Sequence, residues 1–256
     1  MLSKNKIKRI KALNHKKNRT ETNCFLVEGN KLVSDSLYYF DCDLLICTAS
    51  WLATQGTIRA KEWEIVEQED INNASLLKHP QQVIAIFKQP KYGLIPEILK
   101  DKLSIVLDDI QDPGNLGTII RLADWFGIEN IICSKGTVDV FNPKVIQATM
   151  GAIARIQVHY TDIDSFVKEM SVHYRMPIYG TFLEGENIYQ SNLDPHGLII
   201  MGNEGNGISK AIEELVSHKL YIPNYPKHRE TSESLNVAIA TSIICAEFRR
   251  RQIQAI

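Results

Sequence analysis

The feature of this sequence that most constrains its fold is a series of short apolar runs that alternate with helical segments in the second half of the chain. The runs at Leu103–Leu107 and 128–133 are short and rich in β-branched residues, which favours buried strands. Residues 116–126 between them place apolar side chains on one helical face, and Gly127 follows as a stop signal. This alternation predicts a mainly parallel α/β sheet with helices on both faces.

The rest of this half continues the pattern. We expect helices near 143–150 and 163–173, and strands near 154–160, 177–182, 198–201 and 219–222. A last helix over 235–250 is apolar nearly all round, which is typical of a core helix or of a subunit interface.

The first 90 residues form a smaller α/β pattern. Apolar runs at Cys24–Glu28, Cys42–Cys47 and 82–87 predict strands, and residues 30–40 predict a helix. Prolines and a glycine within 88–100 then break the pattern, which indicates a linker. We therefore predict two domains, a small α/β domain over 1–95 and a parallel-sheet domain over 101–256.

Charge is distributed unevenly along the chain. Residues 1–20 hold eight of the 29 Lys and Arg residues and none of the 30 Asp and Glu residues, although the whole chain has a net charge of −1. A basic arm on an acidic body is typical of nucleic-acid binders, and the alternatives are a solvated tail or a transit peptide. Ile7, Ile10 and Leu13 could form one face of a short helix, so the arm could be partly docked.

Composition excludes several classes of protein. Hydrophobic residues make up 44% and charged residues 23% of the chain, which is ordinary for a globular protein. No apolar run approaches the roughly 18–20 residues of a membrane-spanning helix, and no signal peptide is expected. The five cysteines include no C-x-x-C pair, so we expect no disulfide scaffold, no metal site and a cytoplasmic location.

Three segments carry the residues from which chemistry is expected. In the first, DDIQDPGNLGTIIR (108–121), Pro113-Gly114 makes a turn after a strand, and Asn115 is a candidate N-cap of the next helix. Arg121 falls opposite the apolar stripe of that helix. Taken alone, Arg121 could be a solvated surface residue, and Asn115 could be a plain cap.

The second segment, LIIMGNEGNGIS (198–209), runs from a strand through Gly202, Gly205 and Gly207. Its G-x-x-G-x-G spacing matches neither the dinucleotide fingerprint nor a phosphate loop, which argues against a dinucleotide-dependent enzyme. Taken alone, it indicates either a ligand near a sheet edge or a tight structural turn.

The third segment begins with YIPN (221–224), continues through a polar insertion to Ser232 and ends with ESLNVAIA (233–240). Ser232 or Ser234 is the expected cap of the last helix. Asn236 either satisfies local backbone groups or faces a site, since a buried amide needs a partner.

Together and in this order, these segments resemble the SpoU-type RNA ribose 2′-O-methyltransferases of the SPOUT superfamily. The matching stretches are DPGNLGTIIR with DWFG, IIMGNEGNGIS and IPN…ESLNVAIA. NCFLVEGNKLV resembles the start of the small substrate-binding domain that often precedes this catalytic domain, so the resemblance covers nearly the whole chain.

The resemblance implies a parallel-sheet domain with a trefoil knot, a homodimer, and S-adenosylmethionine as methyl donor with no metal. The candidates at the catalytic positions are Arg121, Asn115, Glu204, Ser234 and Asn236. The candidate cofactor contacts are Gly202, Ile222 and Leu235, with Thr181, Leu183, Gly185 and Gly205 along the same pocket. Because a guanidinium resists deprotonation, we expect Arg121 to clamp phosphate and stabilise the developing alkoxide rather than act as a base.

The implied function is 2′-O-methylation of a ribose in structured RNA, with 23S ribosomal RNA expected and transfer RNA as the alternative. A non-catalytic RNA-binding protein of ribosome assembly is the alternative from another class. The 224–232 connection is longer and more basic than is usual in the family, so it could touch substrate RNA. The target nucleotide, and any need for a precursor particle or partner protein, stay open.

Overall fold

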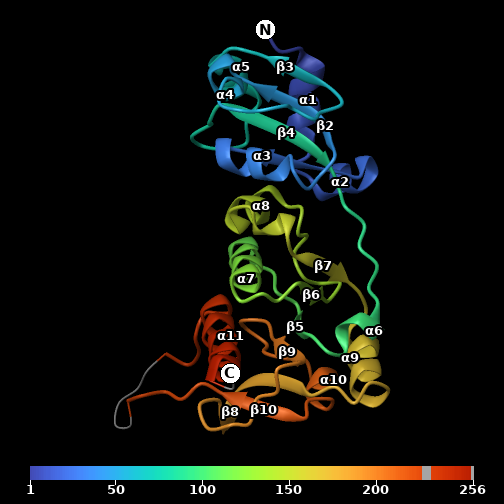
Figure 1. Cartoon of the computed structure of the whole chain (residues 1–256), viewed down its shortest axis with the longest axis vertical. Helices are drawn as coiled ribbons and strands as arrows, with labels where there is room; N and C mark the ends of the chain where they lie inside the picture. Colours follow the sequence, from blue (N-terminus) through green and yellow to red (C-terminus); the bar gives the residue numbers. More distant parts are fainter. Residues whose placement is uncertain (227–231, 255–256) are drawn as a thin grey trace. The chain divides into compact units, whose positions relative to one another are not determined.

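The computed structural model describes residues 1–226 and 232–254, and the chain forms two compact units (Figure 1). The N-terminal unit comprises Met1–Lys91 together with Asp139–Ala154. The C-terminal unit comprises Tyr92–Val138 together with Arg155–Ile256. No helix in the described part of the chain is both long enough and apolar enough to span a bilayer.

The N-terminal unit is built on a four-stranded sheet with the order β1-β4-β2-β3. β4 pairs antiparallel with both β1 and β2, and β2 pairs parallel with β3. The elements of its first part are α1 (Lys4–Ala12), α2 (Lys16–Thr22), β1 (Cys24–Glu28), α3 (Asn30–Ser36), β2 (Cys42–Cys47), α4 (Ala49–Leu52), β3 (Trp63–Ile65), α5 (Gln68–Ala74) and β4 (Val83–Lys88). The strands expected at 24–28, 42–47 and 82–87 are confirmed.

A segment from the middle of the sequence packs in this unit. Residues 139–154 contain α8 (Pro143–Thr149) and the short 3-10 helix η1 (Ala152–Ala154), and α8 lies against β1. The ring centroids of Phe141 and Phe25 are 4.9 Å apart, and Gln147 Nε2 donates to the Glu28 carbonyl oxygen at 2.7 Å. The helix expected at 143–150 is present, but its packing partner lies more than 100 residues away and leaves no local signal.

The basic residues 1–20 are folded rather than a free arm. They form α1 and most of α2, and Ile10 and Leu13 are buried in the core, which confirms the expected docking. Lys6 pairs with Glu62 and Glu64 on the sheet side, at 2.7 and 2.5 Å. Arg9 pairs with Asp43. Part of the positive charge of this segment is therefore neutralised inside the unit.

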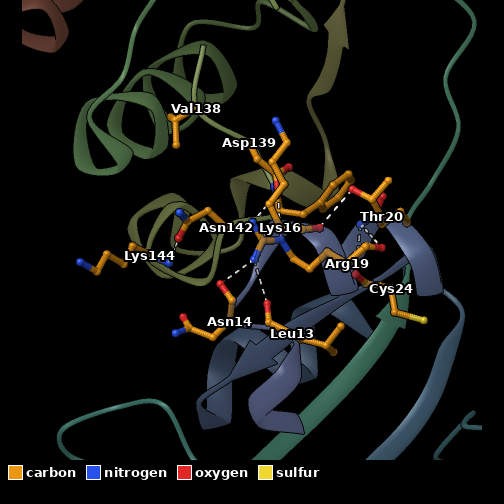
Figure 2. Close-up of polar contacts among 12 residues, drawn as sticks. Leu13, Asn14, Lys16, Arg19, Thr20, Cys24, Val138, Asp139, Asn142 and Lys144 are labelled. Atoms are coloured by element: carbon orange, nitrogen blue, oxygen red, sulfur yellow. Dashed lines mark hydrogen bonds and ion pairs between the residues drawn. The ribbon is translucent and has the colours of Figure 1, made fainter. Parts of the chain in front are cut away.

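Arg19 fixes the corner between α1 and α2 (Figure 2). Its side chain is only 2% exposed, and its Nε and Nη2 donate to Asp139 Oδ2 at 2.9 and 2.6 Å. Nη1 donates to the carbonyl oxygens of Leu13 and Asn14, at 2.8 and 2.9 Å, where α1 has ended. A buried cation is tolerated because the carboxylate and the two carbonyls replace its water.

The C-terminal unit is built on a six-stranded sheet with the order β10-β8-β9-β5-β6-β7, and every neighbouring pair is parallel. Its elements are α6 (Pro96–Leu99), β5 (Leu103–Leu107), α7 (Pro113–Trp125), β6 (Asn130–Cys133), β7 (Gln157–Tyr160), α9 (Ile163–Val172), β8 (Ile178–Asn187), β9 (Gly197–Met201), α10 (Lys210–Glu213), β10 (His218–Tyr221) and α11 (Val237–Gln254). The predicted parallel α/β sheet is confirmed.

Helices cover both faces of this sheet. On one face, Val106, Ile132 and Ile200 pack in one apolar cluster with side chains of α9 and α10. On the other, Tyr179 of β8 contacts Phe248 of α11 with ring centroids 4.9 Å apart, and α11 packs along α7. The expected role of the last helix as core is confirmed for Val237, Ile244 and Phe248, which are buried.

Both predicted helix caps were wrong. Helix α7 begins at Pro113, and Asp112 rather than Asn115 is its N-cap, with Asp112 Oδ1 accepting from the Asn115 N–H at 2.8 Å. Proline suits the first helical position, and a carboxylate is stabilised by the positive end of the helix dipole. At α11, Asn236 Oδ1 accepts from the N–H groups of Ala238 and Ile239 at 3.0 and 3.3 Å, so Asn236 takes the capping role expected of Ser232 or Ser234.

The Arg19 contacts predict a large loss of stability on truncation. Arg19→Met should lower the free energy of unfolding by about 3–5 kcal/mol, because Asp139 and two carbonyls lose a buried partner. Urea denaturation of the full chain measures this. Arg19→Met combined with Asp139→Leu should regain part of the loss, since the uncompensated carboxylate is then gone. A single variant as stable as the wild type would contradict this assignment.

Candidate active site

A cleft of about 1110 Å³ opens at the carboxyl ends of β8, β9 and β10, entirely within the C-terminal unit. Most of its walls come from four segments, residues 181–184, 201–208, 219–225 and 232–235, and Glu213, Val237 and Ala240 complete the lining. Ligand crevices of parallel α/β sheets lie at this edge, and the volume is ample for a nucleoside-sized cofactor. The lining residues include eight of the sequence candidates, which are Thr181, Leu183, Gly202, Glu204, Gly205, Ile222, Ser234 and Leu235.

A break in strand pairing brings residues 181–184 into the cleft. Lys219 of β10 pairs with Gly180, but the next residue, Leu220, pairs with Glu186, so residues 181–185 bulge out of β8. Gly185 at the end of this bulge does not line the cleft, contrary to expectation. A Cβ at Gly185 would overlap the Lys219 carbonyl, so this glycine allows the bulge to rejoin the strand.

The glycine-rich loop after β9 is held by Asn203. Its Oδ1 accepts from the N–H groups of Gly205 and Asn206 at 2.8 and 3.1 Å, and its backbone exchanges two hydrogen bonds with Gly207, at 3.0 and 2.8 Å. Its Nδ2 donates to the Asp109 carbonyl oxygen at 2.8 Å, which links the loop to the segment after β5. A Cβ at Gly202 would overlap the backbone of Gly207 and Ile208, so the loop closes this tightly only with glycine there.

Sequence reasoning did not select Asn203 or Asp108. Asp108 is buried at the end of β5, and its Oδ2 accepts from the Ser209 N–H at 2.8 Å. Asn203 could have been found, because asparagine between glycines commonly bonds backbone N–H groups two residues on. The Asp108 contact spans 101 residues and has no such local signal.

A chain of side-chain hydrogen bonds joins the three motifs. Asn115 Nδ2 donates to Glu204 Oε1, and Asn236 Nδ2 donates to Asn115 Oδ1 at 2.9 Å. Asn236 in turn caps α11. Asn115 and Asn236 do not line the cleft themselves, but they fix the carboxylate of Glu204, which does. Three of the five catalytic candidates are therefore brought together.

Arg121 lies apart from this group. It is exposed on α7, it is not among the cleft residues, and it makes no hydrogen bond or ion pair within residues 1–226 and 232–254. Because Asn115 and Arg121 are six residues apart on one helix, their side chains project from different sides of it. A single chain does not bring the arginine to the cleft.

The connection that follows β10 contributes to the cleft on both sides of residues 227–231. Asn224, Tyr225 and Ser232 line the cleft, whereas residues 227–231 of the predicted 224–232 loop lie outside the described residues. Over the described ranges, no group of three or more His, Cys, Asp or Glu side chains is placed to hold a metal ion.

The parallel α/β sheet and the cleft at its carboxyl edge are those of a ligand-binding α/β protein, and comparison with known proteins specifies the family. The SpoU rRNA Methylase family model matches residues 102–246, and the MRM3-like substrate binding domain model matches residues 4–85. The chain therefore belongs to the SpoU rRNA methylase family, and the expected resemblance is confirmed.

Individual relatives agree. The chain is 31% identical over 246 residues to the 23S rRNA (guanosine(2553)-2'-O)-methyltransferase RlmP of Bacillus subtilis, covering 95% of this chain and 96% of the relative. It also resembles the structure of a putative TrmH-family RNA methyltransferase from Porphyromonas gingivalis, with a TM-score of 0.88, 38% identity, and coverage of 98% and 99%. An AdoMet-bound rRNA methyltransferase from Sinorhizobium meliloti matches with a TM-score of 0.80 and 29% identity, covering 98% of this chain and 96% of that chain.

The Asn203 contacts predict a specific binding defect. Asn203→Ala removes three side-chain hydrogen bonds that shape the loop, so the dissociation constant for S-adenosylmethionine should rise about tenfold or more, as titration calorimetry measures. Asn203→Asp keeps the two acceptor bonds and should weaken binding less. Asn192→Ala, at an exposed asparagine outside the cleft, serves as control. Unchanged affinity in Asn203→Ala would show that the loop does not need this side chain.

Proposed function

We propose that this protein transfers a methyl group from S-adenosylmethionine to a ribose 2′-oxygen of ribosomal RNA, with 23S RNA as the substrate. The observation that carries the proposal is the convergence of the three family motifs on one cleft through Glu204, Asn115 and Asn236. The full-length similarity to a 23S RNA methyltransferase and the match to a substrate-binding domain favour ribosomal over transfer RNA. Because the relative RlmP is a bacterial enzyme, the cytoplasm is the proposed location.

The cleft fits the proposed cofactor. Four carboxylates, Glu184, Glu204, Glu213 and Glu233, line the cavity. Lys219 also lines it and pairs with Glu213 at 2.5 Å, so the described lining keeps an excess of negative charge, which suits a ligand carrying positive charge. The bound cofactor would supply a methyl group activated by its sulfonium sulfur. Backbone groups next to Gly202, Ile222 and Leu235 would hold it, with Thr181, Leu183 and Gly205 beside them.

The remaining chemistry concerns the ribose. Holding the 2′-oxygen in line with the methyl group can supply several kcal/mol. Asn115 and Asn236 hold Glu204 at the cleft, and we assign to these three residues and Ser234 the orientation of the ribose. Arg121 is assigned to clamp the adjacent phosphate and stabilise the developing alkoxide.

Because Arg121 is remote from the cleft of its own chain, the proposal includes a homodimer. Trp125 lies four residues after Arg121, on the same face of α7, and is 84% exposed. Ile239 and Ile253 of α11 are 53% and 74% exposed. A second copy that covers Trp125 would carry Arg121 toward the partner's cleft. The trefoil knot that the family resemblance implies is also part of the proposal.

Ribose-methylation mapping tests the function. Ribosomal and transfer RNA from cells with and without the gene should differ at one or a few 2′-O-methyl positions in 23S RNA, and the purified protein should restore the mark with S-adenosylmethionine. A difference confined to transfer RNA would reassign the substrate. The absence of S-adenosylmethionine binding by calorimetry, also with RNA present, would favour the non-catalytic ribosome-assembly protein.

Arg121→Ala should lower methyl transfer at least about a hundredfold while fold and cofactor affinity are kept, because a charge that stabilises the developing alkoxide is lost. Mixing this variant with Gly202→Val, whose glycine-rich loop cannot close because the new side chain overlaps the backbone of Gly207 and Ile208, should restore activity in mixed dimers well above either variant alone. Adding Trp125→Glu to both chains should abolish the restoration. If mixing restores nothing while mixed dimers form, Arg121 does not act across subunits.

A further inference from the structure

The exposed face of α1 carries a row of three lysines, Lys4, Lys8 and Lys11, here called the lysine stripe. Their spacing of four and three residues places them on one side of the helix. Ile10 and Leu13, on other sides of the segment, are buried in the core. All three lysines are exposed, and none makes a hydrogen bond or ion pair in the part of the chain that the structure describes.

Seven of the eight basic residues of the N-terminal segment fall into two groups, and the eighth, Lys17, pairs with Glu21 at 3.9 Å. Lys6, Arg9 and Arg19 are neutralised by carboxylates of their own unit. The lysine stripe, with the exposed Lys16 at the start of α2, has no such partner among the described residues. The charge of the second group is available to a ligand.

The positions of these lysines destabilise helices α1 and α2. Lys4 and Lys8 are like charges at positions i and i+4, which repel each other. The first turns of α1 and α2 contain lysines and no acidic residue, although the positive end of a helix dipole favours acids there. A ligand rich in negative charge would offset both effects.

We propose that the lysine stripe binds the phosphate backbone of the RNA substrate. The inference rests on the proposed function and names the surface that delivers RNA to the enzyme. The three ammonium groups follow one another along the helix, about one turn apart, and such a row of positive charges suits the regularly spaced phosphates of a nucleic acid. The remainder of the chain carries more acidic than basic residues, so a polyanion is attracted toward the N-terminal segment that carries the stripe.

A membrane is a poorer fit for the same charges. Interfacial helices bind by inserting an apolar face between lipids, and the apolar face of α1 is already buried against the sheet. Arg19 also fixes the corner between α1 and α2, next to Lys16 (Figure 2). The two helices that carry the stripe and Lys16 are therefore held in a fixed arrangement. Preorganised charges lose less entropy on binding.

Deletion of residues 1–20 would be an unclear test, because it also removes Ile10, Leu13 and Arg19 from the core. The sharper variant is Lys4→Gln, Lys8→Gln and Lys11→Gln in the full chain. A matched control triple changes Lys100, Lys168 and Lys210 to Gln, which are exposed lysines of the other unit and lie outside the cleft.

Binding to a fluorescein-labelled 20-nucleotide single-stranded RNA and to a labelled 23S RNA transcript is measured against salt concentration. For the single-stranded probe, the slope of log affinity against log salt should flatten by about 2 in the stripe variant, since each lost contact contributes about 0.7. The control triple should keep the wild-type slope. The stripe variant should also unfold at a slightly higher temperature, opposite in sign to its loss of RNA affinity.

Equal slopes for the stripe variant and the control triple would overturn the proposal. The proposal would also be overturned if phosphatidylserine vesicles bound the wild type but not the stripe variant while the two proteins bound RNA equally well. Methyl transfer by the wild-type enzyme is measured in a separate assay, which tests the proposed function. If the wild type transferred no methyl group but the stripe variant still showed the flattened slope, the lysine stripe would be supported as an RNA-binding surface and the proposed reaction would be refuted.

Discussion

The arrangement of the cleft depends on the side chain of Asn115, which bonds Glu204 on one side and Asn236 on the other. These residues come from three segments more than 30 residues apart that meet at one edge of the sheet. An amide can serve both partners because it donates through nitrogen and accepts through oxygen. An aspartate or a leucine at this position could not do both. The carboxylate of Glu204 is thereby held at the cleft by groups that are themselves fixed to two helices.

This role of Asn115 explains the cap that sequence reasoning misplaced. If Asn115 capped α7, its side-chain oxygen would be used on backbone N–H groups and unavailable to Asn236. Asp112 takes the cap instead, because Pro113 fits the first helical position and has no N–H to satisfy. Asn236 serves two partners with different atoms, because its side-chain oxygen caps α11 and its side-chain nitrogen donates to Asn115. Local propensity predicts that a cap exists, but competition for a distant partner decides which residue supplies it.

The predictable parts of the structure are those set by local pattern. Runs such as Leu103–Leu107 are buried on both sides, so their composition identified them as parallel strands. The parts that escaped prediction depend on distant partners. The bulge at 181–185 is defined by a jump in pairing with β10, and residues 139–154 pack on β1 far earlier in the chain. Likewise, the charge count of residues 1–20 was correct, but the carboxylates that neutralise Arg9 and Arg19 come from Asp43 and Asp139.

The geometry of α7 supports the dimer that the proposed function includes. Asn115 and Arg121 share α7 but project from different sides of it, and Arg121 does not line the cleft of its own chain. Asn115 faces the glycine-rich loop of its own unit, as its bond to Glu204 requires. Arg121 instead shares its face with Trp125, and a tryptophan that is 84% exposed is costly to leave in water. A helix with one face in its own site and another beside an uncovered apolar residue is suited to join two subunits. In the proposed dimer, the burial of Trp125 would stabilise the assembly, and Arg121 on the same face would serve the cleft of the second copy.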